Sequence, residues 1–172
     1  MVLGMNALTF VHTVISLVGI FSGFFLVYGF ISGKGLKHIA SLFLATTTAT
    51  SISGYFFPFH GVTPGMVIGA ISLVALAAAT YARYGRHLAG GWRRTYVIGS
   101  VFALYLNCFV LVVQLFEKVP SLRALAPTQS EGPFKIAQGL VLLLFIALGI
   151  FSVKGFNEHP LRTANQSLPR AA

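Results

Sequence analysis

The stretch 95–118 constrains this chain more than any other, because it is long and apolar enough to cross a lipid bilayer. A helix needs about 20 apolar residues to span the hydrocarbon core. The stretch also carries two amides, Asn107 and Gln114, seven residues apart. On a helix of about 3.6 residues per turn both amides lie on one face, and a polar face in a membrane must contact protein rather than lipid. We therefore expect a bundle of helices packed around this one.

The composition places the chain in the membrane class. Of its 172 residues 56% are hydrophobic and 9% are charged, whereas about 25% of a soluble domain is charged. Twelve Lys and Arg against three acidic residues give a formal net charge of +9. Such a balance can indicate nucleic-acid binding, but here the charges lie in short loops between apolar stretches. The expected partner is therefore a lipid bilayer, and no nucleic acid.

Five apolar stretches predict an all-α integral membrane bundle of five transmembrane helices, occupying residues 1–156. Pro58 ends the second span and Pro64 begins the third. The polar segment 157–172 predicts a disordered cytoplasmic tail. The predicted spans are about residues 7–31, 38–59, 65–82, 95–116 and 135–153.

The basic residues of the loops orient this predicted bundle. With five spans, nine of the twelve Lys and Arg fall on one side, and two of the three acidic residues fall on the other. The positive-inside rule then places the N-terminus outside and the C-terminus in the cytoplasm. The orienting residues of the two inner loops are Lys34, Lys37, Arg83, Arg86, Arg93 and Arg94.

Polar residues of four spans come to a similar depth on the outer side of the predicted bundle. Unpaired polar groups are costly in lipid, so we expect these side chains to converge inside the bundle, with Glu117 and Lys118 at its rim. Two interpretations fit: a pocket for a small ligand, or a plug of hydrogen bonds that only joins helices. The plug is slightly favoured, since buried amides commonly join helices. The residues concerned are His12, His60, Gln114 and Gln138, with Asn107 deeper.

Asn107 lies near the middle of its span, where an amide without a partner is costly. We expect it to bond to a hydroxyl of a neighbouring helix. The candidates are Thr47, Ser51 and Ser16.

The two histidines raise an alternative function, an electron-transfer subunit that carries haem b between His12 and His60. However, His60 follows Pro58 in a predicted loop, whereas paired haem ligands are normally held within helices.

The sequence has no H-E-x-x-H, G-x-S-x-G, Walker or C-x-x-C motif, and no carboxylate within a span. A third interpretation is a small transporter or channel. It would need a water-lined path, which the uncharged spans do not indicate. The main interpretation is thus a non-enzymatic protein without catalytic residues, metal or cofactor, which binds a small apolar or amphiphilic molecule or a membrane-protein partner.

Four segments resemble a group of small bacterial five-helix inner-membrane proteins to which no function is assigned: FLATTTATSISGYFFPFHG, YARYGRHLAGGWRRTYV, ALYLNCFVLVVQLF and LAPTQSEGPF. The resemblance covers most of the chain outside its ends. It implies a multi-pass protein of the cell inner membrane, and it implies no activity, cofactor or site. The size also resembles that of the tryptophan-rich sensory proteins, but Trp92 is the single tryptophan here, so that likeness is of size alone.

Overall fold

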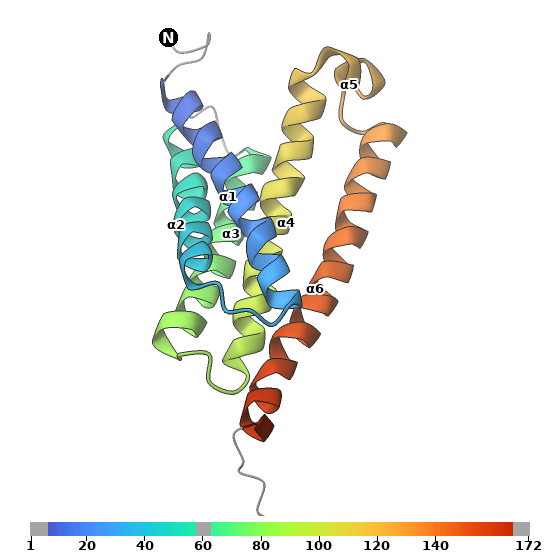
Figure 1. The fold of residues 1–172 in the computed structure, drawn as a ribbon. Helices are drawn as coiled ribbons and strands as arrows, with labels where there is room; N and C mark the ends of the chain where they lie inside the picture. The colour runs from blue at the N-terminus through green and yellow to red at the C-terminus, as the bar shows by residue number, and fades with distance from the viewer. Residues whose placement is uncertain (1–6, 58–62, 167–172) are drawn as a thin grey trace, which may run out of the picture.

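The computed structural model describes residues 7–57 and 63–166, with side chains as far as residue 156, and these parts are helical throughout apart from the connections. Figure 1 shows α1 and α2 side by side, α4 in the middle of the bundle and α6 along one edge. The expected all-α class is thereby confirmed. The elements are α1 (Ala7–Ile31), α2 (Lys37–Ser53), η1 (Gly54–Phe56), α3 (Pro64–Thr80), η2 (Tyr81–Gly85), α4 (Trp92–Lys118), α5 (Pro120–Leu125) and α6 (Gly132–Gln166).

Four helical segments are long and apolar enough to cross a membrane, namely Ala7–Ile31, Pro64–Gly85, Trp92–Lys118 and Gly132–Phe156. They indicate a multi-pass membrane protein. The α2 helix has 17 residues, which is about 26 Å at a rise of ~1.5 Å per residue. That is short of the ~30 Å hydrocarbon core, although η1 prolongs the helix to Phe56. The fifth span therefore stays a prediction.

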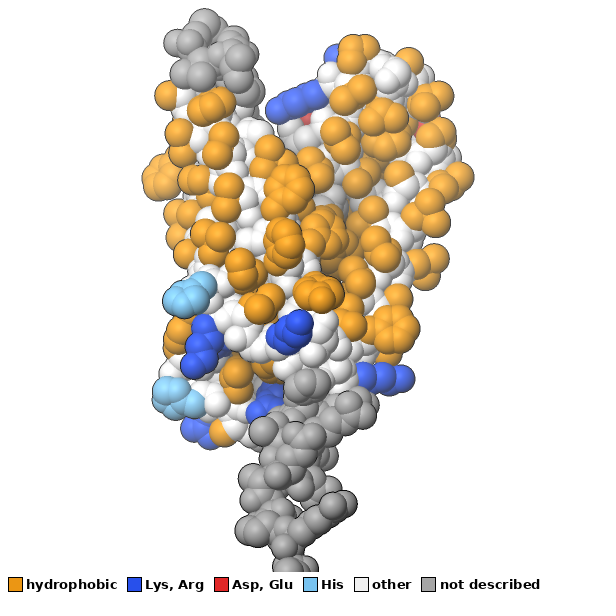
Figure 2. Space-filling view, viewed as in Figure 1, with side chains coloured by type: hydrophobic (Ala, Val, Ile, Leu, Met, Phe, Trp, Pro, Cys, Tyr) orange, Lys and Arg blue, Asp and Glu red, His pale blue; other side chains and the backbone are white. Residues whose placement is uncertain are grey.

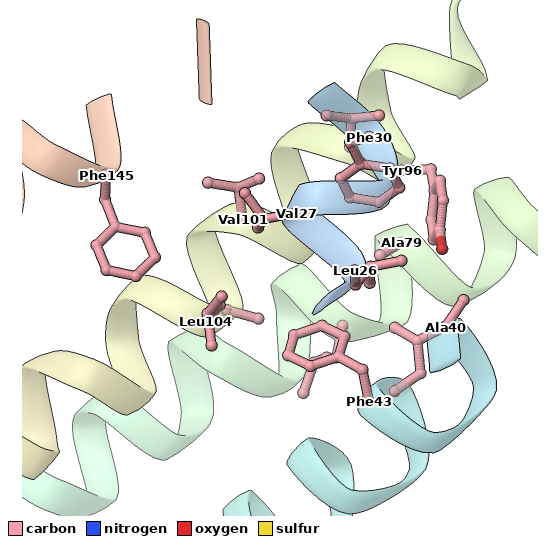
Figure 3. Close-up of a cluster of buried hydrophobic side chains, with 14 of the residues drawn as sticks. Leu26, Val27, Phe30, Ala40, Phe43, Ala79, Tyr96, Val101, Leu104 and Phe145 are labelled. Atoms are coloured by element: carbon pink, nitrogen blue, oxygen red, sulfur yellow. The ribbon is translucent and has the colours of Figure 1, made fainter. Parts of the chain in front are cut away.

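The core lies where α1, α2 and α4 meet. Small residues on α1 let these helices approach closely, because a Cβ at Gly23 would lie 2.5 Å from Leu104 Cδ1 and 2.9 Å from Phe43 Cε2. Below this point the Phe30 and Tyr96 rings pack edge to face, with centroids 5.3 Å apart. Figure 3 shows these side chains converging from different helices, with Phe145 of α6 at the margin. The bundle is thus centred on α1 and α4.

The α6 helix packs along α4 and also contacts α1. Gly155 lies so close to the end of α1 that an added Cβ would collide with the carbonyl oxygens of Ile31 and Phe30. Higher up, the Phe145 ring lies 6.1 Å from Phe24. Much of α6 remains exposed to its surroundings, as expected of a helix that faces lipid on one side.

Three details differ from the spans predicted by the sequence. The second helix, α2, ends at Ser53 and η1 ends at Phe56, whereas the predicted span ran to 59, beyond the residues described here. The α3 helix does not stop near residue 82 but passes into the π-helical turn η2, in which the Arg86 amide bonds to the Tyr81 carbonyl at 2.9 Å. Finally, α6 continues to Gln166, although a disordered tail was expected from residue 157.

Basic side chains gather at the end of the bundle where α1 ends and α4 begins, which we call the basic end. Figure 2 shows Lys, Arg and His colours at this lower end and a broad apolar band above it. The acidic side chains that the structure describes, Glu117 and Glu131, belong to the opposite end.

Candidate functional site

A hollow of about 1230 Å³ opens at the end of the bundle opposite the basic end, and we call it the upper hollow after its place in Figure 1. It lies between the start of α3, the last turns of α4, the α5 segment and the start of α6. Figure 2 shows the molecule notched at this end. The apolar part of its lining includes Ile68, Phe109, Val110, Val113, Phe116 and Phe134, and the polar part includes Thr63, Gln114, Glu117, Lys118, Arg123, Thr128 and Gln129.

Proline residues set the shape of this end. The α4 helix ends at Lys118, and Pro120 then begins α5 at a position where its missing N–H costs nothing. The short α5 brings Arg123 to the hollow. Beyond it, Gln129 adopts a left-handed backbone with φ of 58° and donates from Nε2 to the Val113 carbonyl at 3.2 Å. The connection is therefore tied back onto α4.

Glu131 closes the same connection with a cluster of hydrogen bonds. Its carboxylate accepts from the Thr128 amide at 3.0 Å, the Thr128 hydroxyl at 2.8 Å and the Ser130 amide at 3.0 Å. Desolvation raises the pKa of Glu131. The hydrogen bonds from Thr128 and Ser130 together lower it by a larger amount, so the pKa lies below its ordinary value. Glu131 thus acts as an anionic cap on the loop that precedes α6.

The polar part of the hollow carries more positive than negative charge. Lys118 and Arg123 are exposed cations, while Glu117 is bonded by Gln114, whose Nε2 lies 3.4 Å from Glu117 Oε2. Beside these groups lies an apolar wall of aliphatic and aromatic side chains. This combination suits a molecule with an apolar body and a polar or anionic head.

His12 does not line the upper hollow but contacts the end of α2. Its Nδ1 lies 2.8 Å from the Ser53 hydroxyl, and its ring meets the Phe57 ring edge to face at 5.2 Å. It therefore joins α1 to the end of α2. His60 lies outside the described residues, so the paired haem ligation by His12 and His60 stays a prediction.

Two amides of the predicted cluster also join pairs of helices. The Asn107 Nδ2 donates to Thr47 Oγ1 on α2 at 3.5 Å, the partner being one of the three that the sequence suggested. The Gln138 Nε2 donates to the Phe109 carbonyl of α4 at 3.1 Å, while its buried Oε1 has no hydrogen-bond partner among the described residues. Each of these bonds lies between a different pair of helices.

The structure therefore does not gather the predicted polar residues into one site. Of the four that it describes, Gln114 alone lines the upper hollow, together with Glu117 and Lys118, which were expected at its rim. Two other lining residues, Arg123 and Gln129, were not predicted from the sequence. Their signal was weak, since only the prolines at 120 and 127 indicate that this loop folds back over α4.

Four of the six orienting basic residues, Lys34, Arg83, Arg86 and Arg93, also lie over aromatic rings. Arg83 donates from Nη1 to the Tyr96 hydroxyl at 3.1 Å and from Nη2 to the Lys37 carbonyl at 3.4 Å. The Arg86 guanidinium lies 5.6 Å from the Trp92 ring, and that of Arg93 lies 5.7 Å from the Phe156 ring. These cation–π contacts hold the charges at the basic end.

Within the described residues, no group of three or more His, Cys, Asp or Glu side chains is placed to hold a metal ion. No protein-family model, no curated protein and no solved structure matches this chain. The fold therefore defines the class: a multi-pass helical membrane protein with a hollow at one end. The likeness to small bacterial inner-membrane proteins remains an expectation.

Proposed function

We propose that this chain is a five-span, non-enzymatic protein of the bacterial inner membrane that binds a small amphiphilic molecule in the upper hollow. The observation that carries the proposal is the hollow itself, about 1230 Å³ with one apolar and one polar part. Ligand sites are typically concavities of roughly 300–1,000 Å³ lined by apolar groups and a few polar ones. The upper hollow offers room of that order.

The lining suggests how such a molecule would lie. Its apolar body would rest against Phe109 and Val113, which are half-buried on α4. Its head would reach Lys118 and Arg123, whose charges are free of any ion pair within the described parts of the chain. Gln114 stands between the two regions and offers both a donor and an acceptor.

The ligand proposal is tested on the protein purified in detergent. Mass spectrometry identifies what co-purifies, and thermal unfolding is measured with and without a lipid extract. We expect extract to raise the melting temperature of the wild type, and Gln114→Leu and Lys118→Gln to remove that rise. Gln138→Leu is the matched control, because Gln138 joins α6 to α4 and does not line the hollow; it should leave the extract-dependent rise intact.

A negative result in this experiment would contradict the proposal. If no specific molecule co-purifies and neither hollow variant changes the extract-dependent melting temperature, the upper hollow is not a ligand site. Asn107 and Gln138 then serve only to join helices.

The topology rests on α2 and on the basic end. Together α2 and η1 provide 20 helical residues, about 30 Å of helix, which supports a fifth span. Basic loop residues concentrated at one end support a cytoplasmic basic end and an N-terminus outside. Reporter fusions near Gly90 and Ser130 test this. We expect the Gly90 fusion to report the cytoplasm and the Ser130 fusion the outside. A Gly90 fusion that reports the periplasm, or the same side for both fusions, would refute this topology.

A further inference from the structure

A second concavity runs between α4 and α6 toward the basic end, and we call it the α4–α6 groove. Its volume is about 490 Å³. Ile98, Phe102 and Tyr105 line it from α4, and Leu142, Ile146 and Ile150 from α6. Most of these side chains are exposed, Ile98 by 56% and Ile146 by 51%. Lys154, at the end of the groove, is its one charged lining residue.

The length of the groove suits a single hydrocarbon chain. From Leu142 to Lys154 it follows α6 for about 18 Å, close to the ~15 Å depth of one leaflet of the hydrocarbon core. An acyl chain that lies along α6 in this groove would therefore span one leaflet, with Lys154 at its end.

The charge at its end selects the kind of lipid. Lys154 is exposed, and Arg93 stands at the same end beside Phe156. The acidic side chains that the structure describes are both at the opposite end. Basic side chains at a membrane surface attract anionic headgroups. A lipid whose chain lies in the groove would thus present its phosphate to Lys154.

We infer that the α4–α6 groove is a binding site for one acyl chain of an anionic phospholipid, whose phosphate is held by Lys154. Gly149 keeps the groove open. A Cβ at Gly149 would meet only Val101 Cγ1, at 3.8 Å, so a larger side chain there projects into the groove without striking the backbone. The site is separate from the upper hollow, which lies at the other end of α4.

Native mass spectrometry tests this site, with the full chain in detergent and added phosphatidylglycerol or phosphatidylcholine. We expect one phosphatidylglycerol to be retained in preference to phosphatidylcholine. Lys154→Gln should weaken phosphatidylglycerol retention about fivefold, the factor for one basic side chain at an anionic surface. Gly149→Leu should abolish retention of both lipids.

Two matched controls lie on the same helix. Lys135→Gln removes a cation at the other end of α6, and Gly139→Leu adds a side chain where no atom lies within 4 Å. Both should retain phosphatidylglycerol like the wild type, as should Gln114→Leu, which tests the upper hollow alone. Equal retention of the two lipids, or retention unaffected by Lys154→Gln, would overturn the inference even if Gly149→Leu failed to fold. A dimer that Gly149→Leu dissociates would also overturn it, because a second copy would then occupy the groove.

Discussion

Asn107 and Thr47 join α4 to α2 in the middle of the bundle, through a hydrogen bond of 3.5 Å from Nδ2 to Oγ1. Thr47 is fully buried, and Gly19 of α1 lies against both residues, since a Cβ added there would be 3.1 Å from Thr47 Oγ1 and 3.7 Å from Asn107 Nδ2. The contact thus lies where three helices meet, and it serves to hold helices together.

If Asn107 only joins helices, Asn107→Leu should cost little. Interhelical hydrogen bonds in membranes contribute about 0.6 kcal/mol on average, and the Thr47 hydroxyl can turn to a carbonyl one turn earlier in α2. We expect a stability unchanged within that amount or slightly improved, measured by unfolding in detergent. Thr47→Val and the double variant complete a cycle, in which a coupling energy above ~1.7 kcal/mol would contradict this view.

Gly155→Ala should destabilise the protein more than an alanine elsewhere on α6. The added methyl would collide with the carbonyl oxygens of Ile31 and Phe30, and backbone cannot rotate aside as a side chain can. Overpacking of this kind costs about 1–3 kcal/mol. Gly139→Ala is the control, because its Cβ meets open space. Equal melting temperatures for the two variants would show that α1 and α6 are not in this contact.

Tyr96→Phe should weaken the basic end without changing its charge. Tyr96 is fully buried and its hydroxyl accepts from Arg83 at 3.1 Å. A hydrogen bond to a charged group contributes about 1.5–3 kcal/mol, and since Arg83 is half-exposed we expect a loss near ~1 kcal/mol. Tyr81→Phe, at an exposed tyrosine, serves as the control in the same unfolding assay. A loss equal to that of the control would mean that the bond does not stabilise the fold.

The loop 128–131 should loosen in acid. The pKa of Glu131 is lowered, so its stabilising effect is present above the ordinary glutamate pKa and is lost as the pH falls through the lowered value. Hydrogen-exchange protection of the Thr128 and Ser130 amides, corrected for the intrinsic rate, should therefore be constant near neutral pH and fall below ~4.3. Glu131→Gln should show reduced protection near neutral pH and approach the wild type in acid. Protection that rises in acid would reverse the sign and refute the assignment.

The haem alternative makes a spectroscopic prediction. If the proposed function is right, the purified protein shows no Soret band, either as isolated or after haem is added. A Soret band that His12→Ala or His60→Ala removes would instead establish haem ligation.

The helices were largely predictable from sequence because hydrophobic length is a one-dimensional property. The predicted first span, 7–31, has the same bounds as α1, and α4 runs a few residues beyond both ends of the predicted 95–116. The second span was harder. Its hydroxyl-rich stretch is long enough to predict a span. In the structure the regular α-helix ends at Ser53, and only the 3-10 turn extends it to Phe56.

The site was less predictable, because sequence gives the depth of a residue along its helix but not the neighbour it faces. Asn107 and Gln114 share a face of α4 by spacing, yet Asn107 bonds across to Thr47 whereas Gln114 bonds within α4 to Glu117. Gln138 meets the backbone carbonyl of Phe109, and a carbonyl has no signature in the sequence. Such partners depend on how the helices are rotated against one another.

The π turn at Tyr81–Gly85 has a consequence for how the chain meets the membrane surface. A π turn is one extra residue accommodated in an α-helix, and one residue rotates everything after it by about 100°. The turn follows the apolar part of α3, so the rotation leaves the membrane span in register and redirects only its last residues. It aims Arg83 at Tyr96 and Tyr84 at the Ser41 hydroxyl, 2.8 Å away. A chain shortened by one residue here would lose this rotation, and with it the alignment of Arg83 with Tyr96 and of Tyr84 with Ser41.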